Sequence, residues 1–251
     1  MTQQDQQGGL AGVTAEQKAS WKREAARAAV ATIPDGAIVG LGTGSTADLM
    51  LDELAARVRA GLRVTGVPTS EHTRQQATAL GIPIAELDGV ETLTVSIDGA
   101  DEVSVPQLNL IKGRGGALLH EKLVAAASRF RIIVVDATKL VPVLASTHPV
   151  PVEVVPFGWR HTAGRLVALG ARPVLRVAPG EDAANPQARP YVTDGGSYLL
   201  DCAVSPLYQP EALAAYIKAI TGVVEHGLFV SMTDRVYVGG PQGVQVYNRP
   251  A

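Results

Sequence analysis

The sequence has little of what several protein classes depend on. One cysteine, Cys202, stands among 251 residues, so no disulfide can form within the chain and a cysteine-based zinc cluster is excluded. Aromatic residues make up 4%, too few for the stacking platforms that bind single-stranded nucleic acid. No apolar run approaches the roughly 18 residues that span a bilayer. We therefore expect a cytoplasmic, reducing location, with no membrane partner and Cys202 buried in a strand.

The chain also lacks an excess of charge of either sign. It has 22 Lys and Arg against 24 Asp and Glu, a net charge of −2, which argues against a nucleic-acid partner. Hydrophobic residues make up 46% and charged residues 18%, enough apolar material for one large domain or two small ones. The polar, Gln-rich residues 1–13 do not resemble a signal peptide, and we expect them to be disordered.

Strands alternate with helices through the first half of the chain. The apolar periodicity predicts strands at residues 37–41, 62–67, 82–85, 93–97 and 131–135. It predicts helices at about residues 14–30, 46–60, 70–80 and 117–128. This alternation predicts an α/β fold with a parallel sheet covered by helices on both faces.

The pattern changes near Pro149. Strands at 152–155, 173–177 and 198–204, a strand ending at Thr193, and helices at about 159–169 and 211–220 indicate a small α+β unit. Strands at 223–230, 236–239 and 244–247 then return to the larger domain. We therefore assign residues 1–147 and 223–251 to a larger, catalytic domain and residues 148–222 to an inserted smaller one.

Three segments carry residues suited to binding a ligand or to catalysis. The first, Gly40-Leu41-Gly42-Thr43-Gly44-Ser45-Thr46, follows a strand and opens a helix. Backbone N–H groups at a helix start and hydroxyl donors suit a phosphate. The alternative is a tight turn in which Ser or Thr caps the helix.

The second segment is Ile97-Asp98-Gly99-Ala100-Asp101-Glu102. Its carboxylates stand at the carboxyl end of an apolar strand, where open α/β sheets bind ligands. They could accept hydrogen bonds from sugar hydroxyls. A metal site and a surface turn with a helix cap are the alternatives, although no histidine lies nearby in sequence.

The third segment, Lys112-Gly113-Arg114-Gly115-Gly116, opens a second helix that carries Glu121 near its first turn. Glu121 is either a base held in a polar cleft or a favourable charge near a helix N-terminus. Only six of the 22 basic residues are lysine, and Lys112 and Lys139 both follow predicted strands. Each could be a ligand-binding ammonium or a solvated surface charge.

Four strings in register carry a resemblance to a known family. GLGTGSTA, IDGADEV, KGRGGALLHEK and VVDATK, in this order and spacing, resemble type A ribose-5-phosphate isomerase, from about Lys22 to Val246. The resemblance implies a Rossmann-like domain with an inserted ferredoxin-like domain. It also implies a homodimer or homotetramer that interconverts ribose 5-phosphate and ribulose 5-phosphate in the pentose phosphate pathway, with no cofactor and no metal.

The resemblance also assigns the site. The family's general base falls on Glu121. Its substrate-binding residues fall on Thr43, Gly44, Ser45, Thr46, Asp98, Gly99, Ala100, Asp101, Lys112, Gly113, Arg114, Gly115, Lys139 and Lys22, with Lys18 close to the last. Arg114 replaces a small or apolar residue of many members, the turn often written DNG is Asp194-Gly195-Gly196, and the N-terminal extension looks additional.

The chemistry of an aldose–ketose isomerase fits these residues. One carboxylate can move a proton between carbons 2 and 1 through an enediolate, and the developing oxyanion needs donors. Lys112 and the N–H groups of residues 113–116 are the candidates, Asp98 and Asp101 would hold the open-chain sugar, and residues 42–46 the phosphate. A coenzyme A transferase, with a nucleophilic Glu, and a sugar-phosphate sensor are the alternatives from other classes. A direct assay of ribose 5-phosphate conversion distinguishes the three.

Overall fold

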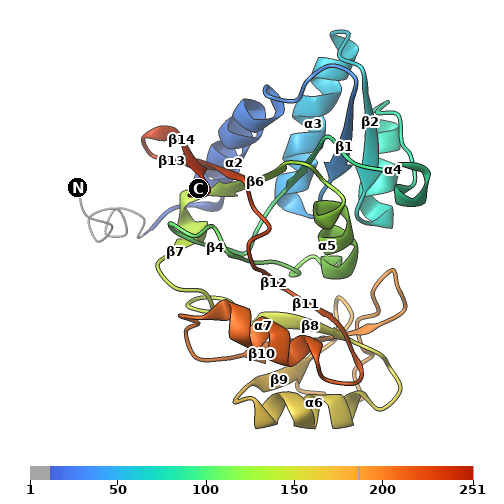
Figure 1. The fold of residues 1–251 in the computed structure, drawn as a ribbon, viewed down its shortest axis with the longest axis vertical. Helices are drawn as coiled ribbons and strands as arrows, with labels where there is room; N and C mark the ends of the chain where they lie inside the picture. Colours follow the sequence, from blue (N-terminus) through green and yellow to red (C-terminus); the bar gives the residue numbers. More distant parts are fainter. Residues whose placement is uncertain (1–11, 186, 251) are drawn as a thin grey trace.

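The structure, a computed structural model, describes residues 12–185 and 187–250, so the expected disorder of the N-terminal extension falls almost wholly outside the described residues. Figure 1 shows a larger upper part that contains the chain's first strands and helices, and a lower part built from residues 150–226. None of the helices in the described ranges combines the length and apolar character needed to cross a membrane.

A six-stranded sheet forms the centre of the upper part. Its order is β14 (Gly243–Asn248), β13 (Arg235–Gly240), β6 (Arg131–Asp136), β3 (Val95–Asp98), β1 (Ala37–Leu41) and β2 (Val64–Pro68). All neighbours are parallel except the β13–β14 hairpin. The predicted α/β fold with a parallel sheet is therefore confirmed.

Helices cover both faces of this sheet because its strands alternate apolar side chains between two cores. On one face Val39 and Leu41 of β1 join a core with helices α2 (Ala15–Val30), α3 (Ser45–Arg59) and α4 (Glu71–Ala79). On the other face Ile38 packs with Val124 of α5 (Leu118–Ala126). The period of two along the strand is what places α5 opposite the other three helices.

The lower part is an antiparallel sheet with two helices, and we call it the antiparallel unit. Its strand order is β11 (Val223–His226), β8 (Val150–Val154), β10 (Tyr198–Ala203) and β9 (Arg172–Leu175), with helices α6 (Trp159–Ala168) and α7 (Pro210–Lys218). Leu166 of α6 and Ile217 of α7 pack on the sheet in a separate core. Cys202 belongs to this core and is fully buried, as predicted.

A third sheet, which the sequence analysis did not predict, lies between the other two. Its order is β12 (Leu228–Phe229), β5 (Leu110–Ile111), β4 (Glu102–Ser104) and β7 (Leu140–Val141). Val103, Leu110 and Phe229 pack in one core with Ile133 and Val236 of the main sheet. Strands of two or three residues leave too short a pattern to detect, and pairing partners far apart in sequence define them. Two short 3-10 turns, η1 (Leu87–Gly89) and η2 (Ala137–Lys139), complete the described elements.

Three predicted strands differ in the structure. Residues 82–85 form a single bridge, between Ile84 and Gly66, and the expected strand before Thr193 is also reduced to isolated bridges. The expected strand 223–230 divides at Gly227, whose carbonyl accepts from the Lys112 N–H and whose N–H donates to Pro151. The first half, β11, pairs with β8 of the antiparallel unit, although the sequence analysis assigned residues 223–251 to the larger domain.

Alanine substitution at two glycines should change the free energy of unfolding in opposite directions. A Cβ at Gly239 of β13 would lie 1.9 Å from the Trp21 carbonyl oxygen of α2, so the helix must shift, whereas a Cβ at Gly164 within α6 would meet nothing within 4 Å. We expect Gly239→Ala to lower the free energy of unfolding by about 1–3 kcal/mol or more. Gly164→Ala should raise it by about 0.5–1 kcal/mol. Urea denaturation checks both, and equal effects would contradict the close packing of α2 on β13.

Candidate active site

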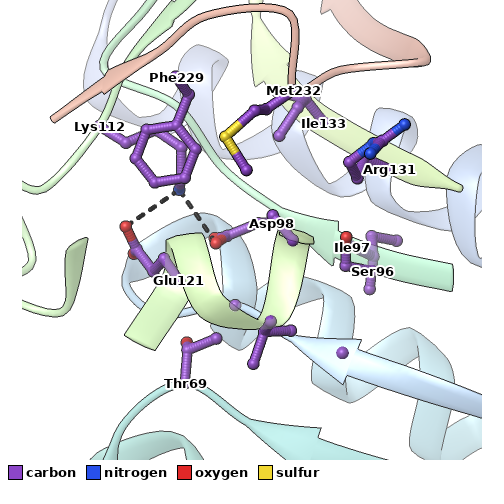
Figure 2. Close-up of a pocket in the computed structure, with 14 residues that line it drawn as sticks. Thr69, Ser96, Ile97, Asp98, Lys112, Glu121, Arg131, Ile133, Phe229 and Met232 are labelled. Atoms are coloured by element: carbon purple, nitrogen blue, oxygen red, sulfur yellow. Dashed lines mark ion pairs between the residues drawn. The ribbon is translucent and has the colours of Figure 1, made fainter. Parts of the chain in front are cut away.

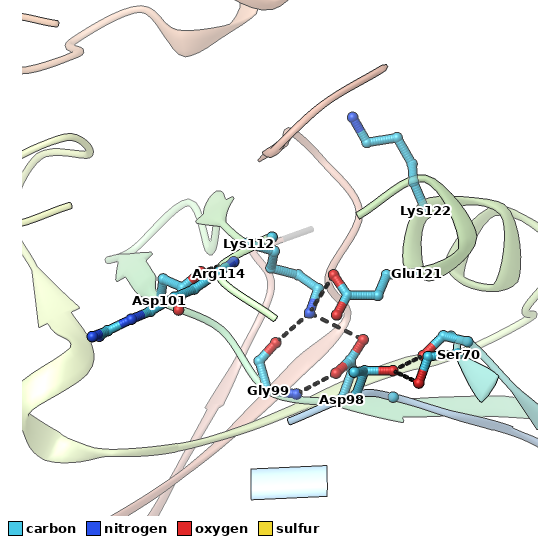
Figure 3. A network of polar contacts seen from close by, with 12 residues as sticks. Ser70, Asp98, Gly99, Asp101, Lys112, Arg114, Glu121 and Lys122 are labelled. Atoms are coloured by element: carbon cyan, nitrogen blue, oxygen red, sulfur yellow. Dashed lines mark hydrogen bonds and ion pairs between the residues drawn. The ribbon is translucent and has the colours of Figure 1, made fainter. Parts of the chain in front are cut away.

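A buried lysine lies between two buried carboxylates. Asp98 ends β3, Lys112 follows β5, and Glu121 lies in the first turn of α5. The Lys112 Nζ atom is 3.0 Å from Asp98 Oδ2 and 3.3 Å from Glu121 Oε2, and it donates a 2.6 Å hydrogen bond to the Gly99 carbonyl (Figures 2 and 3). The exposed fractions of Lys112, Asp98 and Glu121 are 4%, 8% and 4%. Three segments distant in sequence thus meet at one ammonium.

The pKa values of this cluster follow from its burial and its charges. Burial raises the pKa of Glu121 to about 8, and the neighbouring Asp98 carboxylate adds to the shift, while Lys112 opposes it. Burial also raises the pKa of Asp98. Burial alone would lower the pKa of Lys112, but Asp98 and Glu121 raise it above its ordinary value. A single ammonium therefore lies between two buried carboxyl groups, and simultaneous ionisation of both carboxyl groups is unfavourable.

One carboxylate oxygen of Glu121 has no hydrogen-bond donor among the described residues. This oxygen, Oε2, is buried, and the Lys112 ammonium lies 3.3 Å away. Glu121 also lines the cavity described next. A buried carboxyl group with a pKa raised to about 8, on a residue that lines a cavity, is suited to accept and return a proton.

A cavity of about 280 Å³ lies over the cluster. Its lining consists wholly of residues that the sequence analysis selected: Lys22, Thr43, Gly44, Ser45, Thr46, Gly99, Ala100, Asp101, Lys112, Gly113, Arg114, Gly115, Glu121 and Lys139. Asp98 is the one selected residue outside this lining. It lies behind Lys112, where its Oδ1 atom accepts from the Gly99 N–H, and a Cβ at Gly42 would lie 2.0 Å from that oxygen.

One end of the cavity is cationic. Lys22 of α2 reaches it, with Nζ 3.5 Å from Ser45 Oγ and 3.8 Å from Asp136 Oδ2, and Lys139 lines the same cavity. The N-cap of α3, Gly44, provides no side-chain cap, so N–H groups of the first turn remain open to a ligand. Lys22 therefore contributes to the cavity, and the neighbouring Lys18 is not part of its lining.

Thr43 lines the cavity, but its hydroxyl has protein partners. Its Oγ1 atom lies 2.7 Å from Thr69 Oγ1, 2.8 Å from Ser70 Oγ and 3.1 Å from Thr73 Oγ1. Thr73 in turn donates to the Gly42 carbonyl, and Thr69 donates to Leu41. This hydroxyl cluster fixes the first glycine loop on α4, so Thr43 anchors the loop, and its methyl group lies toward Gly115.

The N–H groups of residues 113–116 are not all available, which corrects the expectation that they act together. The Arg114 N–H donates to Asp101 Oδ2 at 3.1 Å, and the Gly116 N–H donates to the Gly113 carbonyl at 3.1 Å. Both donors are therefore engaged within the protein. The Gly115 N–H has no acceptor among the described residues and remains a candidate.

The sequence analysis missed residues of the site that belong to the antiparallel unit. Arg176 donates to the Gly113 and Arg114 carbonyls, and Tyr191 contacts Gly115 and Gly116. Tyr191 stands three residues before the turn Asp194-Gly195-Gly196 of the family resemblance, and this was a usable signal. Arg176 stood in a segment with no motif. Asp136 is fully buried beside Lys22. It belongs to the string VVDATK, in which the sequence analysis assigned a role only to Lys139.

Comparison with known proteins identifies the family. The family model of ribose 5-phosphate isomerase A (phosphoriboisomerase A) matches residues 65–243. The chain belongs to this family. The ribose-5-phosphate isomerase A of Gloeobacter violaceus is 52% identical over 90% of this chain and 94% of its own, and that of Thermomicrobium roseum is 45% identical over 91% and 93%.

Solved members of the ribose 5-phosphate isomerase A family share the fold. The Methanocaldococcus jannaschii enzyme has a TM-score of 0.85 at 36% identity, covering 91% of this chain and 98% of its own. A D-ribose-5-phosphate isomerase in complex with phospho-erythronic acid has a TM-score of 0.87 at 36% identity, covering 92% and 99%. These matches favour the isomerase over the transferase and sensor alternatives.

Metal ligation finds no support in the geometry. Within residues 12–185 and 187–250, no group of three or more His, Cys, Asp or Glu side chains is arranged to hold a metal ion. The Asp98 and Asp101 carboxylates instead have the Lys112 ammonium and backbone N–H groups as partners.

The raised pKa of Glu121 predicts a pH-dependent stability. A carboxyl with a pKa of about 8 in the folded protein and an ordinary pKa of 4.5 stabilises the fold below pH 4.5, and this contribution is lost as the pH rises toward 8. Relative to Glu121→Gln, the wild-type protein should lose at most about 1.4 kcal/mol per pH unit across this window. Urea denaturation from pH 5 to 8.5 measures the difference. The exposed Glu24→Gln is the control. A free energy of unfolding of the wild-type protein that stays constant or rises with pH, relative to that of Glu121→Gln, would contradict the assignment.

Proposed function

We propose that Glu121 is the base through which this member of the ribose 5-phosphate isomerase A family interconverts ribose 5-phosphate and ribulose 5-phosphate. The observation that carries the proposal is the buried Oε2 atom of Glu121. This oxygen accepts no hydrogen bond from the described residues and lies beside the Lys112 ammonium, on a residue that lines the cavity.

The proposed reaction moves one proton between adjacent carbons. Glu121 removes the proton from carbon 2 of the open-chain aldose, and the electrons move to the aldehyde oxygen to give an enediolate. The neutral carboxyl then returns a proton to carbon 1, and transfer of the hydroxyl proton from O2 to O1 completes the ketose. A positioned base contributes about 10²–10⁴-fold, so the charged intermediate needs further stabilisation.

Lys112 supplies that stabilisation in the proposal. Its ammonium is fixed by Asp98 and the Gly99 carbonyl before substrate enters, so it need not reorganise as negative charge develops. Because Asp98 lies behind Lys112, we assign it the role of holding the lysine. Asp101 lines the cavity and would contact the sugar hydroxyls. No metal is needed, because the lysine supplies the positive charge.

The cationic end of the cavity is the proposed phosphate site. Lys22, Lys139 and Ser45, with the open first turn of α3, surround this end. Ammonium groups, a hydroxyl and backbone N–H groups are the donors that a phosphate dianion accepts. Binding the phosphate there would hold the reacting carbons over Glu121, at the other side of the cavity.

The antiparallel unit is proposed to be an inserted ferredoxin-like domain. Its element order, β8-α6-β9-β10-α7-β11, is the β-α-β-β-α-β order of that fold, and its two helices pack on its own sheet. The pairing of β11 with β8 supports a domain end near His226 rather than residue 222. The larger, Rossmann-like domain would then comprise the chain before about residue 148 and after about residue 227.

We further propose that the protein is a homodimer or homotetramer in the cytoplasm. Phe157 and Tyr208 are candidates for contacts between copies, since 94% and 83% of their surfaces are exposed in the single chain. Light scattering at micromolar concentration measures the number of copies. The single buried cysteine supports a reducing compartment, and cell fractionation tests the location.

Replacement of Glu121 tests the proposed function. Glu121→Gln keeps the shape of the side chain but removes the base, so we expect kcat for ribose 5-phosphate to fall by about 10²–10⁴-fold. In the wild-type enzyme, kcat/KM should rise with pH and level off above about pH 8 as Glu121 ionises. The assay measures ribulose 5-phosphate formation in buffer containing EDTA. A Glu121→Gln enzyme with wild-type kcat would show that the carboxylate is only a helix-end charge.

Replacement of Lys22 tests the phosphate site. Lys22→Met removes an ammonium beside Ser45, and a hydrogen bond to a charged group contributes about 1.5–3 kcal/mol. We therefore expect KM for ribose 5-phosphate to rise roughly 10- to 100-fold. Lys18→Met, one turn earlier on the same helix and outside the cavity lining, is the matched control. Turnover of free ribose should be poor and alike in all three proteins, and an equal loss with free ribose would rule out phosphate binding by Lys22.

A further inference from the structure

One arginine of the antiparallel unit holds the second glycine loop, residues 113–116, from outside the cavity. Arg176 directly follows β9, and its Nη1 atom donates to the Gly113 carbonyl at 3.0 Å and to the Arg114 carbonyl at 3.1 Å. Its Nε and Nη2 atoms donate to Asp201 of β10 at 2.9 and 2.5 Å. This bidentate ion pair fixes the plane of the guanidinium group. The guanidinium group in turn fixes the Gly113 and Arg114 carbonyls.

Tyr191 completes the contact with this loop. Its N–H donates to the Arg176 carbonyl at 2.8 Å, its ring centre is 5.9 Å from the guanidinium carbon, and its hydroxyl lies 3.5 Å from the Gly115 carbonyl. A Cβ at Gly116 would lie 2.2 Å from the Tyr191 hydroxyl oxygen, so only glycine permits this approach. The antiparallel unit therefore contacts three consecutive carbonyls of the loop, those of residues 113–115.

Because the peptide bond is planar, a contact that fixes a carbonyl of the loop also fixes the direction of the N–H group in the same peptide. In a trans peptide, the carbonyl and the following N–H point in opposite directions. The carbonyl of Gly113 accepts from Arg176 while the N–H of Arg114, in the same peptide, donates to Asp101 Oδ2. Likewise, the carbonyl of Arg114 accepts from Arg176, so the Gly115 N–H points away from Arg176, on the side of the loop that lines the cavity.

We propose that Arg176, supported by Asp201 and Tyr191, is a positioning residue for the isomerisation. It sets the orientation of Asp101 and of the Gly115 N–H, which we assign as a donor to an oxygen of the reacting sugar. The proposal rests on the proposed function, because it concerns the same cavity and the same substrate. It makes the antiparallel unit part of the catalytic apparatus, although this unit contributes no residue to the cavity lining.

A pair of arginine variants tests the proposal. Arg176→Met removes the donors to the loop carbonyls. Arg189→Met is the matched control, because Arg189 belongs to the segment between Arg176 and Tyr191 and forms an exposed ion pair with Glu181, without contact to the glycine loop. We expect kcat of Arg176→Met for ribose 5-phosphate to fall about 10- to 100-fold, since small displacements of positioned groups have effects of this size. KM should change less than about threefold, because the phosphate end is untouched. Arg189→Met should stay within about twofold in both.

Two further variants separate positioning from simple loss of structure. Asp201→Asn keeps Arg176 but weakens the ion pair that fixes the plane of its guanidinium group. Tyr191→Phe removes only the hydroxyl. Both should lower kcat less than Arg176→Met does, with KM again nearly unchanged. Arg176→Lys keeps the positive charge but lacks the planar guanidinium donors, so its kcat should remain below that of the wild-type enzyme. Added ethylguanidinium should partly restore kcat in Arg176→Ala and leave Arg189→Ala unaffected.

The outcomes divide clearly. A selective loss of kcat in Arg176→Met, with guanidinium rescue, supports the proposal. Wild-type kcat in Arg176→Met overturns it, as does a parallel change of kcat and KM without rescue, which would indicate a structural role. If Arg176→Met does not fold, wild-type kcat in both Asp201→Asn and Tyr191→Phe overturns it. Failure of the wild-type and Arg189→Met proteins to convert ribose 5-phosphate would instead refute the proposed function.

Discussion

The ammonium of Lys112 between Asp98 and Glu121 is the interaction on which the rest of the site depends. Removing three ionisable groups from water is expensive unless they satisfy one another, and breaking such a cluster by removing one partner is strongly destabilising. Here one cation neutralises one carboxylate, and the second carboxyl has a pKa raised to about 8. The arrangement therefore favours a carboxyl that gains and loses a proton near neutral pH. Close packing enforces it: Gly42 leaves room for Asp98, and Gly227 leaves room for the Lys112 carbonyl.

All three sheets contribute to placing this cluster. The carboxyl ends of β1, β3 and β6 in the main sheet lead into the segments at 42–46, 98–101 and 136–139, the edge at which open parallel sheets bind ligands. The short third sheet sets Lys112 through β5, and the antiparallel unit holds the following glycine loop through Arg176. The chain passes between these parts at Gly227, where hydrogen bonds to Lys112 and Pro151 fix the junction. Displacement of any sheet would therefore move a group that faces the cavity.

Much of the architecture could be predicted from local pattern. The alternation of apolar strands and amphipathic helices predicted β1, β6 and α2 nearly to the residue, because each of these elements carries a full period of its own pattern. Thr14, the first residue of the predicted helix, caps α2 and forms a reciprocal capping box with Gln17. The third sheet and the division at Gly227 were not predictable in this way. Strands of two residues carry no period, and the pairing of β5 with β12 joins segments more than a hundred residues apart in sequence.

The sequence by itself determined which groups could act, namely two glycine loops, a carboxylate pair, Lys112 and Glu121, because spacing and residue type restrict what each segment can bind. Only the tertiary structure decided how they act. It placed Asp98 behind Lys112, directed the Thr43 hydroxyl to α4, selected Lys22 beside Ser45, and used the Arg114 and Gly116 N–H groups within the protein. It also brought in Arg176, which no motif marks. The reason is physical: burial, the direction of a hydrogen bond and the pKa of a carboxyl depend on neighbours that are close in space and distant in sequence.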